Sequence, residues 1–412
     1  MKSPKAAIIG AGFIGAVHVD ILRRLGVPVA GVLAESVQAS QEAARQLGLT
    51  KAYSSLEELL DDGEVAVVHD CTPNRWHREY NVRALQAGKH VLSEKPLGMD
   101  SREAAEQASA AEAAARRGIL AAVNFGYRYY PLVQQMRAMV QRGEIGAVRL
   151  VHGTYTQDWL CESTDYNWRV EPELGGKLRA LGDIGSHWLD LAQYVTGQQI
   201  TEVAGDLATL LPRRQKPGRE VQTFAGGGQP SHASPGPAPD WVDVRTDDYA
   251  AVLFRTEAGA HGNVVISQAS PGRKNHLTLE VVGSEATLYW DQEQPNQLWI
   301  GRRHRANALL MKDPGLLCPQ AGQYVRLPGG HNEGYYDALY HLFRNFYGTL
   351  AWQGEGEGGT TLPEQRPAEG EKAAAPGWVG DFPTFAQSYR LALVLEAIWE
   401  SSQGGHWVKV GA

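Results

Sequence analysis

The segment Ile8–Gly15 has the sequence IIGAGFIG, in which the pattern G-x-G-x-x-G directly follows a short apolar run. Glycines at this spacing allow a sharp turn at Gly10, close approach of a pyrophosphate to the backbone at Gly12, and tight packing of a helix on a strand at Gly15. The phosphates then lie at the positive N-terminus of that helix. The pattern predicts a dinucleotide-binding turn, with an ordinary glycine turn as the alternative. The residues expected to contact the dinucleotide here are Gly10, Gly12, Phe13, Ile14 and Gly15.

Apolar runs typical of buried strands alternate with helical patterns along the first 125 residues. The predicted strands are Ala6–Ile9, Val29–Leu33, Val65–Val68, His90–Leu92 and Ile119–Val123. The stretches between them have the periodicity of helices. This alternation predicts an α/β fold, a doubly wound parallel sheet covered on both faces. We expect residues 1–125 to form a Rossmann dinucleotide-binding domain.

The pattern changes after about residue 125. We expect residues 126–412 to form an α+β domain for substrate binding and oligomerisation, with a large open, mostly antiparallel sheet. Its helices include Tyr335–Leu350 and Phe385–Ser402, which we expect to pack against that sheet. Two insertions, at about 212–240 and 354–378, lack periodicity and are predicted to be surface loops or partly disordered. The predicted strands of the sheet are Val148–Tyr155, Val203–Leu211, Tyr249–Phe254, His261–Ser267, Leu277–Val282 and Ala286–Trp290.

The overall composition argues against several classes of protein. The 412 residues include 39 Lys and Arg against 46 Asp and Glu, a net charge of −7, so no nucleic-acid partner is expected. No run approaches the roughly 18 consecutive apolar residues of a membrane helix, and no signal peptide is recognisable at the N-terminus. The three cysteines are scattered, which predicts neither a disulfide framework nor a zinc ribbon. We expect a cytoplasmic protein without a membrane partner.

Glu35 bears on the choice between the two nicotinamide dinucleotides. An acid about 20 residues after the glycine turn accepts hydrogen bonds from the adenosine ribose hydroxyls, although Glu35 as a solvated residue at a helix entry is the alternative. No Lys or Arg lies in Ala34–Ser40 to neutralise a 2′-phosphate. We therefore predict NAD as the cofactor, with NADP possible, and place Glu35 and Ser36 at the ribose.

Two further motifs complete a recognisable set. Glu94-Lys95-Pro96 follows the strand His90–Leu92, at the carboxyl edge where doubly wound sheets bind ligands. Asp183-Ile184-Gly185-Ser186-His187 lies far downstream. In this order and spacing, the three motifs resemble the signatures of the Gfo/Idh/MocA oxidoreductase family, which includes glucose–fructose oxidoreductase and inositol dehydrogenases. The resemblance covers nearly the whole chain.

Longer stretches are similar to a sugar-dehydrogenase branch of this family, which includes levoglucosan dehydrogenase. They are Thr156–Leu160, Thr164–Arg169, Ser267-Gln268 with Gly272–Asn275, and Gly329–Gly334. The resemblance implies hydride transfer between nicotinamide and a secondary alcohol of a sugar, anhydrosugar, glycoside or cyclitol. It also implies a homodimer or homotetramer.

The implied reaction gives three residues a chemical role. Removal of a hydride from a carbinol requires a proton acceptor, and His187 suits because the usual pKa of histidine is about 6.5. If Asp183–His187 opens a helix, Asp183 lies on the same face and can stabilise the imidazolium or bind another hydroxyl. Lys95 matches the family's lysine and can steady a developing alkoxide or relay its proton. The sequence leaves open whether Lys95 or His187 is the base. No additional His or Cys has metal-ligand spacing, so no metal is predicted.

The resemblance also implies weaker assignments around these three residues. Aromatic rings can pack on the C–H surface of a sugar while polar groups bind its hydroxyls, although core packing is the alternative for each aromatic. The further cofactor contacts expected are Thr72, Pro73, Asn74, His77, Glu94 and Asn124. The further substrate contacts expected are Arg128, Tyr155, Trp159, Trp168, Arg169, Lys274 and His331.

Two other functions stay open on the sequence alone. One is redox-neutral cleavage of a glycoside through a transient keto-sugar, and the other is an NAD-linked sensor without catalysis. Intact Lys95, Asp183 and His187 argue against a sensor. A serine hydrolase and a P-loop nucleotidase are excluded because neither G-x-S-x-G nor G-x-x-x-x-G-K-[ST] occurs.

Overall fold

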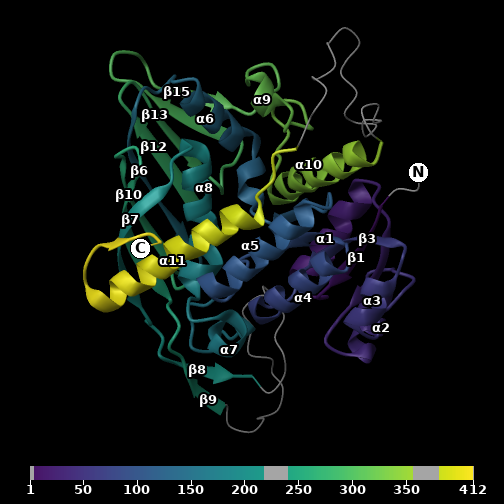
Figure 1. The fold of residues 1–412 in the computed structure, drawn as a ribbon. Coiled ribbons are helices and arrows are strands. Elements are labelled where there is room, and N and C mark those ends of the chain that lie inside the picture. The colour runs from purple at the N-terminus through teal and green to yellow at the C-terminus, as the bar shows by residue number, and fades with distance from the viewer. Residues whose placement is uncertain (1–3, 218–239, 356–379, 412) are drawn as a thin grey trace, which may run out of the picture.

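In the computed structural model, which describes residues 4–217, 240–355 and 380–411, residues 4–125 form the first half of the fold and the later residues form the second half. The first half contains a five-stranded parallel sheet, as predicted (Figure 1). Its strand order is β2-β1-β3-β4-β5. The apolar side chains that predicted these strands are buried, because both faces of the sheet are covered. The strands are β1 (Lys5–Ile9), β2 (Val29–Leu33), β3 (Val65–Asp70), β4 (His90–Ser93) and β5 (Ala121–Val123).

Five helices connect and follow these strands. The side chains of Ser36, Ser55 and Asp100 accept hydrogen bonds from the amides of Ala39, Glu58 and Glu103, which caps the N-termini of α2, α3 and α5. The helices are α1 (Phe13–Arg24), α2 (Val37–Gln46), α3 (Leu56–Asp61), α4 (Asn74–Gln86) and α5 (Ser101–Ala115).

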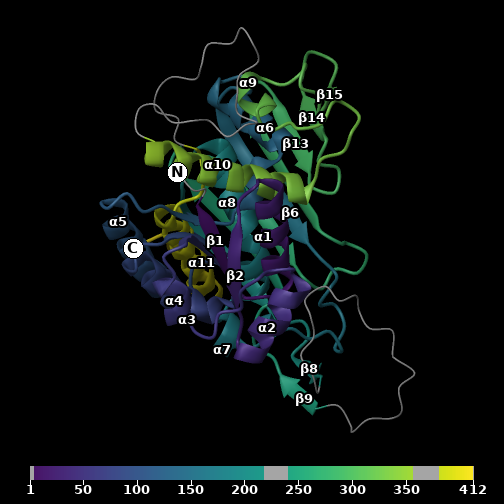
Figure 2. The same cartoon turned by 90° about the vertical axis from the view of Figure 1, so that its right-hand side faces the viewer.

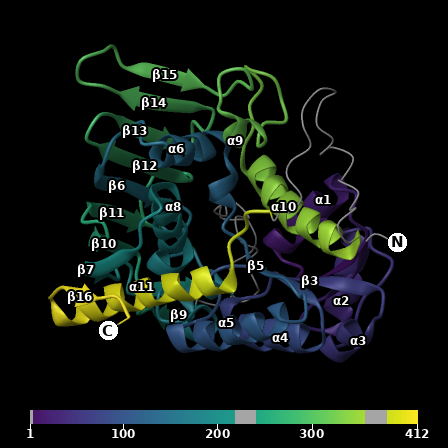
Figure 3. The same ribbon diagram turned by 45° about the horizontal axis from the view of Figure 1, so that its top comes forward.

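A nine-stranded sheet dominates the second half (Figure 3). Neighbouring strands are antiparallel except β6 and β11, which are parallel. The predicted open, mostly antiparallel sheet is therefore confirmed, and β14, β15 and β16 are additional to the prediction. In spatial order the strands are β15 (Ala308–Met311), β14 (Gln297–Gly301), β13 (Thr287–Asp291), β12 (His276–Gly283), β6 (Val148–Thr156), β11 (His261–Ser267), β10 (Tyr249–Thr256), β7 (Ile200–Ala208) and β16 (Val408–Lys409).

Helices on the inner face of this sheet carry residues toward the first half. Trp188 of α8 is fully buried and donates from Nε1 to the backbone oxygen of Thr278 at 2.7 Å, which fixes α8 on β12. The 3₁₀ turn η1 and the π-helical turn η3 precede α6 and α8. The elements are η1 (Gly126–Tyr129), α6 (Pro131–Gln141), η2 (Trp168–Val170), α7 (Pro172–Gly175), η3 (Leu181–Gly185), α8 (Ser186–Thr196) and α9 (Pro319–Gly322).

The prediction that both C-terminal helices pack on the second sheet is wrong for α10 (Tyr335–Glu355). This helix lies beside α1 (Figures 1 and 2) and also packs on η1. Its Phe343 ring meets the buried ring of His18 in α1. Helix α11 (Phe385–Gly404) packs between β7 and α5. The amide of Val123 in β5 donates to the carbonyl of Pro383 at 2.9 Å, so the end of the chain returns to the edge of the first sheet.

The first insertion is not entirely a loop, which corrects the prediction. Strand β8 (Arg213–Lys216) pairs with β9 (Asp240–Asp243), and fully buried Arg214 donates to Asp248 at 2.8 Å. Residues 218–239 and 356–379, which carry the rest of both insertions, lie outside the described residues. Within the described part of the chain, no helix combines the length and apolar character needed to cross a bilayer.

A buried ion pair ties three of these elements together. Arg128 of η1 donates from Nε to Asp190 of α8 at 2.8 Å and from Nη1 to Gln387 of α11 at 3.1 Å. We expect Arg128→Met to lower the free energy of unfolding by about 3–5 kcal/mol, because it leaves the Asp190 carboxylate buried without its cation. Urea denaturation measures this change. The control Arg83→Met, which breaks an exposed pair with Glu57, should change it by less than about 1 kcal/mol; equal losses would contradict the prediction.

Candidate active site

A cleft of about 770 Å³ opens at the carboxyl edge of the parallel sheet. Parallel strands bring their carboxyl ends to one edge, so residues far apart in sequence meet there. The first half contributes Gly10, Gly12, Phe13, Ile14, Glu35, Thr72, Pro73, Asn74, Trp76, Tyr80, Glu94 and Lys95 to its lining. The second half contributes Tyr127, Tyr155, Gln157, Trp168, Arg169, Asp183, His187, Lys274, Asn275 and Tyr335.

The glycine turn has the geometry that its sequence predicts. Gly10 has a φ of +93°, and a Cβ there would lie 2.6 Å from the carbonyl oxygen of Cys71. A Cβ on Gly15 would lie 2.1 Å from the carbonyl oxygen of Gly10, so α1 can approach β1 only with glycine at this position. A Cβ on Gly12 would meet nothing within 4 Å, which leaves open space beside the first amides of α1. This space and the helix N-terminus fit a dinucleotide's phosphates.

Of the two residues expected at the adenosine ribose, Glu35 alone lines the cleft. It lies just beyond the end of β2 and is exposed. Ser36 is not part of the lining, because its hydroxyl accepts a hydrogen bond from the amide of Ala39 at 3.0 Å and caps α2.

The turn after β3 is held by side-chain hydrogen bonds to backbone groups. Asn74 donates to the carbonyl of Gly175 at 2.8 Å, which connects the turn with the second half. The two ring nitrogens of buried His77 lie 2.8 and 2.9 Å from the carbonyl oxygens of Pro96 and Thr72. His77 therefore holds the ends of β3 and β4 together from behind the cleft.

Lys95 and Asp183 meet across the floor of the cleft. Lys95 Nζ donates to Oδ1 of Asp183 at 2.7 Å and to its backbone oxygen at 2.8 Å. Arg169 Nε lies 3.1 Å from Oδ1, and Gln268 donates to Oδ2 at 2.8 Å. Burial by itself would raise the pKa of Asp183, but the cations of Arg169 and Lys95 outweigh it and hold this pKa well below its usual range. Asp183 is thus a carboxylate, on the π-helical turn that precedes α8.

His187 lies in the first turn of α8 among aromatic rings. The ring centroids of Tyr127 and Phe125 lie 4.9 and 5.8 Å from its own. Its Nδ1 is buried and has no hydrogen-bond partner among the described residues, which leaves Nε2 as the ring nitrogen open to the cleft. Burial and the nearby charge of Lys95 lower the pKa of His187 to about 3. The imidazole is therefore neutral at ordinary pH and able to accept a proton.

Several polar side chains of the cleft were not among the predicted site residues. Asn275 accepts hydrogen bonds at Oδ1 from the Tyr155 hydroxyl and from Gln157, both at 2.8 Å, and it donates to Tyr127 at 2.9 Å. Gln268 directly follows a predicted strand, and Gln157 and Asn275 lie two residues from the ends of two others, so a search for polar residues at strand ends would have found all three. No such signal marks Tyr127 or Tyr335.

Besides Gly15, Ser36 and His77, four further predicted contacts lie outside the cleft lining, each for a structural reason. Arg128 is paired with Asp190, and Asn124 lies behind Glu94, to which it donates at 2.6 Å. Trp159 packs beside Leu160 and Val170 and donates to Gln157 at 2.8 Å. His331 is exposed on the loop before α10. By contrast, Tyr155, Trp168, Arg169 and Lys274 do line the cleft.

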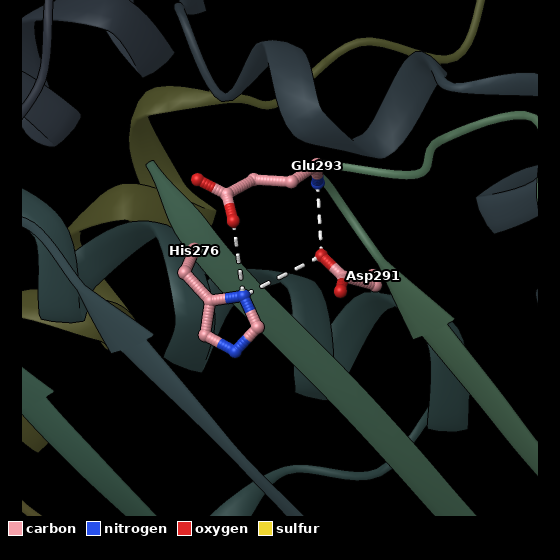
Figure 4. A group of neighbouring side chains, drawn as sticks. All are labelled: His276, Asp291 and Glu293. Atoms are coloured by element: carbon pink, nitrogen blue, oxygen red, sulfur yellow. Dashed lines mark hydrogen bonds and ion pairs between the residues drawn. The ribbon is translucent and has the colours of Figure 1, made fainter. Parts of the chain in front are cut away.

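One group of metal-ligating side chain types lies outside the cleft, on the outer face of the second sheet (Figure 4). His276 Nδ1 lies 3.7 Å from Oδ1 of Asp291 and 3.4 Å from Oε2 of Glu293. Glu293 also accepts a hydrogen bond at Oε1 from the amide of Asn275 at 3.0 Å. We interpret the group as polar contacts at the start of β12, next to Asn275, which lines the cleft.

The open space beside Gly12 makes a specific prediction. Gly12→Val should raise the dissociation constant of NADH at least about tenfold, because the side chain occupies space that a phosphate needs. Because no atom lies within 4 Å of that Cβ, we expect the thermal unfolding temperature to stay near that of the unsubstituted protein. NADH fluorescence titration measures binding. Gly63→Val is the matched control, since a Cβ there also meets nothing within 4 Å and Gly63 lies outside the cleft lining. Unchanged NADH binding in Gly12→Val would contradict this assignment.

Comparisons with known proteins agree with this geometry. Residues 5–125 match the model of an oxidoreductase family with an NAD-binding Rossmann fold, and residues 133–289 match the model of the GFO/IDH/MocA C-terminal domain. Levoglucosan dehydrogenase of Pseudarthrobacter phenanthrenivorans is 30% identical over 427 residues, covering 100% of this chain and 99% of that protein. The 1,5-anhydro-D-fructose reductase of Ensifer adhaerens is 34% identical over 308 residues, covering 73% of this chain and 86% of that protein.

Solved structures are similar over the full length. An oxidoreductase domain protein from Kribbella flavida superposes with a TM-score of 0.82 at 30% identity, covering 100% of both chains. A levoglucosan dehydrogenase in complex with NADH and levoglucosan superposes with a TM-score of 0.80 at 26% identity, covering 99% of this chain and 100% of that chain. The chain therefore belongs to the GFO/IDH/MocA family of oxidoreductases, and its residues 5–125 form an NAD-binding Rossmann fold.

Proposed function

We propose that this protein is an NAD-dependent dehydrogenase of a secondary alcohol in a sugar, anhydrosugar, glycoside or cyclitol. The observation that carries the proposal is the meeting of Lys95, Asp183 and His187 in the same cleft as the glycine turn. Relatives named levoglucosan dehydrogenase and 1,5-anhydro-D-fructose reductase support this substrate class.

Different residues of the cleft accept the proton and stabilise the oxygen during alcohol oxidation. Bound NAD⁺ supplies the hydride acceptor. His187 is neutral because its pKa is about 3, so it can take the hydroxyl proton at the nitrogen that faces the cleft. Lys95, held by two hydrogen bonds to Asp183, keeps a third N–H to donate to the oxygen on which negative charge develops. Asp183 positions Lys95 and neutralises its charge.

The wall formed by the second half suits a polyol. Tyr155, Gln157 and Asn275 form a continuous hydrogen-bonded group, so their polar atoms are held in fixed positions. The Arg169 guanidinium lies 4.4 Å from the centroid of the Trp168 ring, and both side chains line the cleft. An aromatic face beside fixed donors and acceptors can bind a sugar by its C–H surface and its hydroxyls. We therefore assign Tyr155, Trp168, Arg169 and Lys274 to substrate binding.

We further propose that the protein works in the cytoplasm as a homodimer or homotetramer. Its three cysteines are free thiols, which suits a reducing compartment. Leu150, Leu253 and Val265 are exposed on neighbouring strands of the second sheet, and such an apolar face supports pairing with a second copy.

The substrate assignment is tested by mixing the protein with NAD⁺ or NADP⁺ and each member of a panel of sugars, anhydrosugars, glycosides and cyclitols. The absorbance of the reduced coenzyme measures the reaction. We expect net NADH formation with at least one member of the panel and a preference for NAD⁺. Glycoside cleavage without net NADH would identify the redox-neutral reaction instead. Tight NADH binding without turnover of any compound would refute the proposed function.

Variants of the two groups that handle protons provide a mechanistic test. Lys95→Met and His187→Asn should each lower kcat by about 10²-fold or more, because each removes a positioned proton-transfer or charge-stabilising group. NADH affinity should stay within about threefold of the unsubstituted enzyme. Steady-state kinetics and fluorescence titration separate the two effects. Near-normal kcat in both variants would exclude this mechanism.

The lowered pKa of His187 predicts an unusual pH profile. A histidine with the ordinary pKa of about 6.5 would become protonated, and so unable to act as a base, below that pH. With a pKa of about 3, His187 stays neutral well below pH 6.5. We expect no acidic inflection near pH 6.5 in kcat/KM for alcohol oxidation, measured at saturating NAD⁺. A loss of activity centred near that pH, and absent from His187→Asn, would contradict the assignment.

A further inference from the structure

A run of buried polar side chains leads from α10 to the rim of the cleft. Tyr347 OH lies 2.8 Å from His69 Nε2, and His69 Nδ1 lies 2.9 Å from His18 Nδ1. His18 Nε2 then lies 3.1 Å from Oε1 of Glu94, which lines the cleft beside Lys95. His18 and His69 are fully buried, and Tyr347 is 2% exposed. The proposed reaction uses none of these three side chains.

The hydrogen bond at the Glu94 end of this run has a definite direction. The hydrogen bond from His18 is one of the interactions that, against the effect of burial, lower the pKa of Glu94 to about 2, so Glu94 is a carboxylate and only accepts. His18 therefore carries a proton on Nε2. At the other end, burial lowers the pKa of His69 well below its usual value, so this ring is neutral and one of its two nitrogens donates while the other accepts.

A neighbouring thiol belongs to the same buried group. Cys71 Sγ lies 3.3 Å from His18 Nδ1, and burial raises the pKa of this thiol well above its usual value. The thiol is therefore neutral and makes only a weak hydrogen bond, so His69 is the main partner of His18 Nδ1. Hydrogen bonds that share a ring in this way polarise one another.

We propose that Tyr347, His69 and His18 are positioning residues that fix the Glu94 carboxylate for binding of the nicotinamide coenzyme. His18 and Asn124 occupy Oε1, while Oε2 accepts only the long bond of 3.3 Å from the Lys95 amide among the described residues. Oε2 is thus available to a hydroxyl or amide donor of the coenzyme. The inference rests on the proposed function for its ligand, and α10, which begins at the cleft with Tyr335, is thereby coupled to the cofactor site.

Packing alone does not account for this run. Burying unpaired polar groups is costly, and apolar side chains of similar shape often stabilise a core equally well or better. A role limited to packing predicts that variants change stability and leave coenzyme affinity unaltered. A positioning role predicts that variants of similar shape leave stability nearly unaltered and weaken coenzyme binding.

The test measures the dissociation constant of NADH together with thermal unfolding. We expect His18→Leu to weaken NADH binding about tenfold or more and Tyr347→Phe about two- to fivefold. Each substitution removes a hydrogen-bonding group that holds the next side chain of the run in place. His18→Gln keeps an amide donor that can reach Glu94, so it should restore binding to within about twofold of the unsubstituted protein. Tyr129→Phe is the control, since it removes another buried hydroxyl, one bonded to the carbonyl of Asp381.

A second measurement does not depend on whether every variant folds. ¹⁵N NMR of protein labelled at histidine should show a proton on Nε2 of His18, which faces Glu94, and a neutral ring for His69. Tyr347→Phe should shift the His69 signals and leave those of His331 unchanged.

Absence of a proton on His18 Nε2 would overturn the proposal, as would equal NADH affinity in Tyr347→Phe and Tyr129→Phe or no recovery in His18→Gln. These readouts need no sugar. If the protein binds NADH but oxidises no polyol, the proposed function fails while the positioning role can still be supported.

Discussion

The ion pair between Lys95 and Asp183 is the contact on which the site depends. It joins the end of β4 to the turn before α8, across 88 residues of sequence, and the two side chains are only 10% and 14% exposed. A charge removed from water to this extent needs its partner, and its loss costs far more than that of an exposed pair. Among the described residues, the side chain of Lys95 is held by Asp183 of the second half, so docking of the second half on the first also assembles the proposed catalytic group.

Further buried polar contacts support this ion pair from the second half. Gln268 donates to Asp183 and lies 3.5 Å from Arg179, whose partner Asp248 also binds Arg214 of β8. Strand β8 of the first insertion is thus connected, through fully buried ion pairs, to the residues that contact Asp183. This arrangement explains why a segment with no regular hydrophobic pattern nevertheless contains a buried arginine and a strand.

The sequence predicted best where one physical requirement determines one residue. The glycine turn follows from short-range sterics, and the five parallel strands follow from burial on both faces of the sheet. The order and spacing of the three motifs indicated which residues meet at its edge. The packing of α10 on α1 could not be predicted, because its aromatic side chains would suit either sheet. Arg128 shows the other limit: an arginine close to a predicted site has the same signature whether it faces a ligand or, as here, Asp190. Only the fold distinguishes the two.

The electrostatics of the cleft separate the roles that the sequence left open. The ammonium of Lys95 is one of the charges that lower the pKa of Asp183, and it also lowers the pKa of His187. Lys95 thus acts together with Arg169 to keep the carboxylate ionised and together with burial to keep the imidazole neutral. If Lys95 were the base, it would have to give up its proton while it pairs with the Asp183 carboxylate, and the ion pair that positions it would be lost. These contacts support our proposal that His187 accepts the proton and that Lys95 donates to the oxygen.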